Sequence, residues 1–199
     1  RNGSWWGGGI ARAPMEEGAI VRTAMAVRVM QAFGTPAMKT DFDRRIALAR
    51  NFLISAKPVS NDDMAMQVAG LHWSGVPADK IRTAGKALIA MQHPDGGWGQ
   101  NRNLASDALA TGESLYALHE AGVLKSTDPA YQKGVKYLLS TQCEDGSWYV
   151  RSRAPKFQPY FQSGFPFDPP QWLPPPGAPA RGRPLPDSVS PTRRGPSPC

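Results

Sequence analysis

Three polar residues that could line a functional pocket share one face of a predicted helix. Asp107, Thr111 and Ser114 follow the spacing i, i+4 and i+7, which places their side chains in one stripe. A carboxylate and two hydroxyl groups in this arrangement could contact a ligand. We favour the simpler interpretation, in which Asp107 caps the helix and the other two residues form its polar face.

Two histidines, His72 and His119, occupy equivalent places before a glycine. They could be metal ligands, but no carboxylate or cysteine keeps ligand spacing with them, so we predict no metal site and no cofactor. A helix C-terminus favours a partly cationic side chain, which explains both histidines. The two cysteines, Cys143 and Cys199, have unlike surroundings, so no disulfide framework can be read. Cys143 is most simply a packing residue.

The overall composition is compatible with one ordinary core or with part of a larger one: the chain has 199 residues, of which 41% are hydrophobic. Its net charge of +7 comes from basic residues scattered among acidic ones, which argues against a nucleic-acid partner. No apolar run approaches the roughly 18 residues of a membrane span. The first residue is Arg1, which indicates a cleaved start or a fragment.

Six amphipathic segments of helical length are predicted, and glycine, proline or aspartate separates them. They run over residues 19–33, 41–56, 62–74, 78–92, 106–121 and 129–142. We interpret them as three helical hairpins, without any convincing strand. The first helix of each hairpin ends in a common pattern that closes with Gly34, Gly75 or Gly122.

A glutamine, a glycine and a tryptophan recur at the same spacing after the second and third hairpins. Residues 92–98 contain Gln92, Gly96 and Trp98, and residues 142–148 contain Gln142, Gly146 and Trp148. We refer to these segments as the 92–98 clip and the 142–148 clip. Asp-Gly and Pro-Asp-Gly predict a tight turn, and the tryptophan is a large anchor that can pack on a neighbouring hairpin. The glutamine can bond carbonyls at the helix end.

Residues 2–5, which include Trp5, have the pattern of a truncated clip, and a missing copy is expected after Ala56. There the chain reads Lys57-Pro58-Val59-Ser60, so one hairpin has lost the clip. Helical hairpins at a regular period predict a repeat array, in which each hairpin buries its apolar face against the next one. We therefore expect the clips to be structural.

Together the clips resemble the QW repeats of squalene-hopene and oxidosqualene cyclases, and more loosely those of protein prenyltransferase β-subunits. Within that superfamily, residues 104–112 and 157–165 are most similar to bacterial prenyltransferase and squalene-oxidase repeat proteins. The resemblance covers residues 1–167. It implies an all-α fold, an α/α toroid whose inner helices ring a central cavity, of which this chain supplies an incomplete arc.

The resemblance also implies a candidate acid. Squalene-hopene-type cyclases protonate an alkene with the middle acid of an Asp-x-Asp-Asp-Thr-Ala motif, and the nearest stretch here is residues 60–65. Ser60 and Met64 replace the first aspartate and the threonine, so Asp62 is the acid by position, beside Asp63. We favour the interpretation that Asn61, Asp62 and Asp63 cap and charge the start of a helix.

Two further requirements of this superfamily are weakly met. A cyclase cavity is lined by aromatic side chains, and Phe33, Trp73 and Tyr116 are the only ones on the predicted inner helices. We take Asp107 and Thr111 of the polar stripe, together with Tyr116 of the same predicted helix, as the cavity candidates. A prenyltransferase needs an Asp, Cys and His set for zinc, and Cys143 lies within a clip instead.

The sequence changes character after Phe167. Twelve of the twenty prolines fall between Pro166 and Pro198, which excludes a continuous helix, so residues 168–199 are expected to be a disordered tail. The tail is either out-of-frame sequence or a genuine Pro-rich linker. Gln171 and Trp172 are interpreted as the last trace of a further inner helix.

Two functions remain open. The first is a non-catalytic repeat module, whose partners would be an apolar isoprenoid or polyene ligand or further repeats of a longer chain. The second is a terpenoid cyclase that uses Asp62 as its general acid in the intact protein. The resemblance is to bacterial proteins, and the sequence leaves the compartment open between the cytoplasm, the periplasm and a membrane surface.

Overall fold

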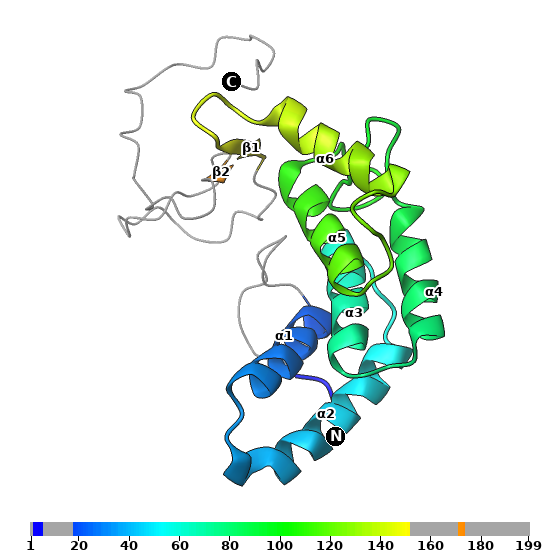
Figure 1. Cartoon of the computed structure of the whole chain (residues 1–199), viewed down its shortest axis with the longest axis vertical. Coiled ribbons are helices and arrows are strands. Elements are labelled where there is room, and N and C mark those ends of the chain that lie inside the picture. The colour runs from blue at the N-terminus through cyan, green and yellow to red at the C-terminus, as the bar shows by residue number, and fades with distance from the viewer. Residues whose placement is uncertain (1, 6–17, 152–170, 174–199) are drawn as a thin grey trace, which may run out of the picture.

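The chain folds into three helical hairpins (Figure 1). The computed structural model describes residues 2–5, 18–151 and 171–173. The hairpins consist of α1 (Gly18–Phe33) with α2 (Lys39–Ser55), α3 (Asn61–Trp73) with α4 (Ala78–Ile89), and α5 (Ala108–Glu120) with α6 (Pro129–Thr141). A short 3-10 helix, η1 (Pro36–Met38), precedes α2. The predicted all-helical hairpin fold is confirmed, with boundaries within a few residues of those expected.

The first helices of the hairpins form one row, in which α1 packs on α3 and α3 packs on α5 (Figure 1). The second helices each lie against the first helix of their own hairpin, and α2 also contacts α3. α3 is therefore in contact with four other helices and is buried over most of its surface.

The helices of the row approach closely because small residues face one another. A Cβ on Gly70 would lie 2.8 Å from the Cβ of Ala24 and 2.9 Å from a methyl group of Leu53, so α3 packs almost directly on α1 and α2. The small residues in the core of the row are Ala24, Ala65, Ala69, Ala110 and Ala117. Close packing of such residues leaves little space for an apolar ligand inside the row.

Two short strands modify the sequence-based expectation of a purely helical chain. β1 (Trp148–Val150) pairs antiparallel with β2 (Gln171–Leu173), and Tyr149 lies opposite Trp172. The interpretation of Gln171 and Trp172 as the trace of a helix is therefore wrong. Prolines 169–170 and 174–176 flank the segment, and proline removes the backbone donors that a helix needs. The rest of the predicted disordered tail lies outside the described residues.

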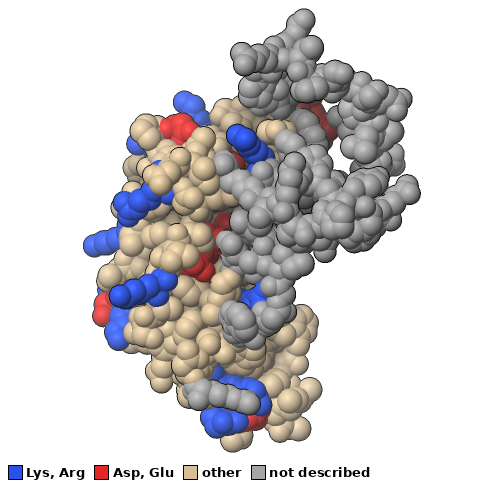
Figure 2. Space-filling model, turned by 180° about the vertical axis from the view of Figure 1, so that it is seen from behind, with Lys and Arg blue, Asp and Glu red and all other residues tan. Residues whose placement is uncertain are grey.

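Charged side chains are distributed over much of the described surface. In Figure 2, lysine and arginine side chains lie apart from one another along the height of the molecule, with acidic side chains between some of them. Among the described residues, no helix is long and apolar enough to cross a membrane.

Candidate functional site

The 92–98 clip joins the second hairpin to the third. The indole of Trp98 is fully buried, and its Nε1–H donates to the carbonyl of Leu88 at 2.9 Å. The backbone N–H of Trp98 donates to Thr111 Oγ1 at 2.9 Å. The ring also lies against α6, because a Cβ on Gly134 would be 3.0 Å from it. Trp98 thus contacts helices of both hairpins.

The turn within this clip needs its glutamine and its glycine. Gly96 has φ +91°, and a Cβ there would lie 2.6 Å from the carbonyl oxygen of Lys133 in α6. Gln92 Nε2 donates to the carbonyls of Gly96 and Ala130, both at 2.8 Å. The glutamine therefore bonds its own turn and the next hairpin. The expected bond to carbonyls at the end of its own helix is not the one formed.

The 142–148 clip repeats this geometry. Gln142 Nε2 donates to the carbonyl of Gly146 at 2.8 Å, and Gly146 has φ +81°. The Nε1–H of Trp148 donates to the carbonyl of Leu138 at 2.8 Å, ten residues before it, as in Trp98 and Leu88. Trp148 is only partly buried, and its backbone continues into β1.

Residues 2–5 make the equivalent contacts on the first hairpin. The backbone N–H of Trp5 donates to Thr23 Oγ1 at 2.9 Å. Gly3 has φ +85°, and a Cβ there would collide with the carbonyl oxygen of Leu48 in α2, as one on Gly96 would with Lys133 in α6. Thr23 and Thr111, both fully buried, thus accept the same bond. Their role was not identified from the sequence.

No clip precedes the middle hairpin, formed by α3 and α4, and other contacts take its place. When the first helices are aligned on Gly34, Gly75 and Gly122, Met64 of α3 stands where α1 has Thr23 and α5 has Thr111. Gln67 of α3 donates to the carbonyls of Leu53 at 2.8 Å and Ala56 at 2.9 Å. Gln67 therefore supplies hydrogen bonds at the end of α2, as the indole of Trp98 does near the end of α4. A polar residue facing the core was its only sequence signal.

The three cavity candidates lie in different surroundings. Asp107 caps α5, since its carboxylate accepts the N–H of Ala110 at 2.8 Å, and it also accepts Gln100 Nε2 at 3.0 Å. Thr111 contacts the 92–98 clip, as described above. Tyr116, by contrast, lies on an exposed part of α5. Asp107 and Thr111 are thus brought together at the start of α5, and Tyr116 is not part of that group.

Ser114, the third residue of the polar stripe, connects α5 to α3. Its Oγ donates to the carbonyl of Ala110 at 2.7 Å and lies 3.0 Å from Asn61 Nδ2, which donates to it. Asn61 therefore joins the two helices. The residue that caps α3 is Ser60, whose side chain accepts the N–H of Asp63 at 3.1 Å. The expectation that Asn61 caps this helix is wrong, because its amide is used in the contact with α5.

The adjacent aspartates are both buried at the start of α3. Asp63 accepts the N–H of Val59 at 3.1 Å through Oδ2, and no hydrogen-bond donor among the described residues reaches its other oxygen. Burial raises the pKa of Asp63, and the N–H groups of Val59 and Ser60 oppose part of that shift. The negative charge of Asp62 raises the pKa of another carboxyl group, that of Glu113 in α5.

Glu113 is a third carboxyl group near the candidate acid, and it was not identified from the sequence. Burial raises the pKa of Glu113 to about 8, and the charges of Asp62 and Asp107 add to the shift. Its carboxyl is therefore largely protonated at neutral pH. The sequence could have indicated Glu113 by its position in the repeat, because the equivalent residues of α1 and α3 are Met25 and Met66. A carboxyl group at a position that is otherwise apolar is unusual.

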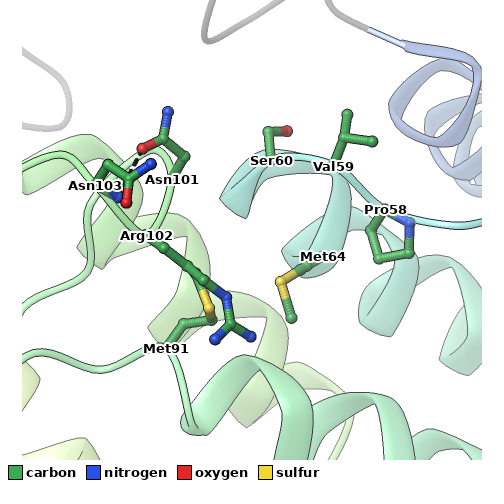
Figure 3. Close-up of a pocket in the computed structure, with 8 residues that line it drawn as sticks. All are labelled: Pro58, Val59, Ser60, Met64, Met91, Asn101, Arg102 and Asn103. Carbon is green, nitrogen blue, oxygen red and sulfur yellow. Dashed lines mark hydrogen bonds between the residues drawn. The ribbon is translucent and has the colours of Figure 1, made fainter.

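A groove of about 460 Å³ opens beside the start of α3 (Figure 3). The side chains of Met64 and Met91 lie in it, and the guanidinium of Arg102 points between them. Pro58, Val59 and Ser60 form one rim, and the other comes from Asn101 and Asn103. None of the predicted site residues lines this groove. Within the described residues, no cluster of His, Cys, Asp and Glu could hold a metal ion.

Part of this chain is similar to a known cyclase. No family model matches the chain. A squalene–hopene cyclase of Bradyrhizobium diazoefficiens is 34% identical to it over 112 residues, which are half of this chain and 16% of that cyclase. The chain thus spans a small part of the length of the curated relative that it matches. At the superfamily level, this similarity supports a cyclase-like repeat protein.

Proposed function

We propose that this chain is a section of the wall of a cyclase-like α/α toroid, and that the section itself is a scaffold without catalytic activity. The observation that carries the proposal is the position of Trp98 between two hairpins. Its indole is fully buried and donates to α4, and its backbone N–H donates to Thr111 of the next hairpin. The similarity to a squalene–hopene cyclase supports it. The clips are then the QW motifs of that architecture, and residues 1–167 are its repeat segment.

The surroundings of Asp62 also favour a scaffold. Ser60 and Met64 replace two residues of the acidic motif, and Ser60 is used as a helix cap. Trp73 lies at the opposite end of α3, where Arg28 stacks on its ring at 5.5 Å. Phe33 and Tyr116 are exposed. The aromatic residues of the described first helices therefore offer no ring face to a carbocation formed beside Asp62.

Replacing the bridging tryptophan tests the scaffold role. Trp98→Ala should lower the free energy of unfolding by about 3–5 kcal/mol, because a fully buried aromatic side chain is lost. Trp148→Ala is the matched control, since Trp148 makes the same indole bond from a partly exposed position. Equal, small effects of the two variants in urea denaturation would contradict the proposal.

A second candidate function is alkene protonation in the intact protein. It is favoured by Glu113, a neighbour of the buried Asp62, because the pKa of Glu113 is raised to about 8 and one carboxyl of this group therefore holds its proton at neutral pH. The carboxyl proton would form a C–H bond at one alkene carbon, and the cation would remain on the other. Loss of a proton from the cyclised cation would give the neutral product and balance the reaction.

The two candidates differ in their response to polyenes. The full-length protein would be incubated with squalene and shorter polyprenyl compounds, with Asp62→Asn and Glu144→Gln as the variant and the control. Products that disappear only in Asp62→Asn would establish catalysis. Absence of product from the wild-type protein, together with the effect of Trp98→Ala, would leave the scaffold function.

A further inference from the structure

The 92–98 clip fills the space beside the start of α5. The N–H of Trp98 donates to Thr111 Oγ1, and a Cβ on Gly97 would lie 2.6 Å from the Cβ of Ser106. The clip therefore lies directly on the residue that precedes Asp107, the cap of α5, and on the first turn of the helix.

The same place in the middle hairpin holds the groove beside the start of α3 (Figure 3). When the first helices are aligned as above, Val59 corresponds to Ser106 and Met64 to Thr111. Both Val59 and Met64 line the groove. The middle hairpin has a neighbouring hairpin on each side, so the groove lies away from both ends of the row (Figure 1). A position at which one repeat breaks the pattern of the others is a candidate functional position.

Arg102 brings a positive charge into this groove. Its guanidinium points between Met64 and Met91 (Figure 3). Among the described residues, the side-chain ion pairs all lie within α2, and none of the residues that line the groove is acidic. A guanidinium is a planar donor that can bind a carboxylate or a phosphate through two parallel hydrogen bonds. The charge of Arg102 therefore favours an anionic group in the groove.

The rest of the groove suits an apolar chain. Met64 and Met91 contribute flexible thioether side chains, which adapt to apolar ligands of different shape. Pro58 and Val59 form an apolar part of the rim, and Val59 is 87% exposed. The groove volume of about 460 Å³ lies within the range of roughly 300–1,000 Å³ that is typical of small-molecule sites.

We propose that this groove binds an amphiphile in which one anionic head group, a carboxylate or a phosphate, is attached to an apolar chain. Arg102 binds the head group, and Met64 and Met91 contact the chain. The site goes beyond the proposed scaffold role, because that role depends on Trp98, which does not line the groove.

A titration of the whole chain with dodecanoate, kept below the concentration at which it forms micelles, tests the site. When the methionine methyl groups carry a ¹³C label, the NMR signals of Met64 and Met91 should shift together and saturate. Met25 and Met38 are the control methionines, since they are exposed residues outside the groove, and their signals should not shift.

Three further compounds identify the part of the ligand that is recognised. Dodecyl phosphate carries the other candidate head group, so its affinity relative to dodecanoate shows which anion the groove prefers. Dodecanol lacks the charge and acetate lacks the chain. Each of these two should bind at least about tenfold more weakly than the better of the two anionic amphiphiles.

Arg102→Gln should weaken binding of the anionic amphiphile by roughly tenfold or more, because the charge-assisted hydrogen bonds are lost. Arg82→Gln is the matched control, since Arg82 is an exposed arginine of α4 outside the groove. It removes the same charge from a chain of net charge +7, so it corrects for a general attraction of anions. Met64→Thr introduces the residue found in the other first helices and should weaken binding by roughly fivefold, because apolar contact is lost.

The outcomes separate this site from a general effect of surfactants and from the scaffold role. Absence of binding to the wild-type protein, equal binding by Arg102→Gln and Arg82→Gln, or equal binding of dodecanol overturns the site. Shifts of the control methionines as large as those in the groove also overturn it. The scaffold role is tested separately by the stability of Trp98→Ala, so either proposal can fail while the other stands. Unchanged circular dichroism and urea midpoints of the groove variants exclude misfolding as the cause.

Discussion

Trp98 and Thr111 form a hydrogen bond between the backbone N–H of the tryptophan and the threonine Oγ1, at 2.9 Å, and both residues are fully buried. Trp5 and Thr23 form the same bond at the first hairpin. No tryptophan clip precedes the middle hairpin, and its first helix has Met64 in place of the threonine. At the start of the three first helices, the clip and its threonine are therefore present together, at α1 and α5, or absent together, at α3.

Thr111→Val should destabilise the protein by about 1–3 kcal/mol, because the shape of the side chain is kept while a buried N–H loses its acceptor. Thr83→Val is the control, since the Thr83 hydroxyl is exposed and donates to the carbonyl of Asp79 in its own helix. Urea denaturation of both variants gives the comparison. If Thr111→Val costs no more than Thr83→Val, the bond does not hold the clip.

Gly96→Ala should destabilise the protein by at least about 1 kcal/mol, since alanine is strained at φ +91° and its Cβ would meet the carbonyl oxygen of Lys133. Gly112→Ala should be neutral or stabilising, because Gly112 is helical and no atom of the described residues lies within 4 Å of its Cβ position. Thermal unfolding followed by circular dichroism measures both. Opposite signs are expected, and equal losses would contradict this view of the turn.

Gln67→Leu should destabilise the protein by about 1–3 kcal/mol, because the carbonyls of Leu53 and Ala56 lose a buried donor. The loss should also loosen the end of α2. Gln132→Leu is the control, since Gln132 makes an exposed bond to Ser126. Faster amide exchange in the last turn of α2, seen in Gln67→Leu and not in the control, would show that Gln67 replaces the missing clip.

Glu113 should make stability fall as the pH rises. Its pKa is raised from 4.5 to about 8 in the folded protein, so the folded state binds more protons than the unfolded state between these values. The contribution of Glu113 to the free energy of unfolding is therefore fully present below about pH 4.5, and it is lost as the pH rises through about 8. Glu113→Gln should remove the dependence and gain stability over the wild type across that range.

Urea denaturation at several pH values between 5 and 8.5 measures this effect. Glu144→Gln corrects for the loss of one carboxyl group, because Glu144 is exposed in the 142–148 clip. Buried Asp63 also has a raised pKa, so some dependence of the same sign should remain in Glu113→Gln. A wild-type protein and a Glu113→Gln variant with parallel pH profiles would show that Glu113 is not protonated as described.

The sequence by itself determined the helices, their pairing into hairpins and the recurrence of the clips. Apolar residues at helical spacing, the glycines at helix ends and the Gln, Gly and Trp pattern are local signals, so they can be read without knowing which segments meet. The loss of one clip after Ala56 was visible for the same reason. The strand formed by Gln171 and Trp172 could not be predicted from the sequence, because it pairs with residues 148–150, which lie far away in the chain.

Only the tertiary structure decided the surroundings of the polar residues. Thr111 accepts the N–H of Trp98, Gln67 replaces a missing indole, and Asn61 joins α3 to α5 instead of capping its own helix. Glu113 became a protonated acid because packing buried it near Asp62 and Asp107. Burial and hydrogen-bond partners arise from contacts between residues far apart in the chain, and local spacing carries no record of them.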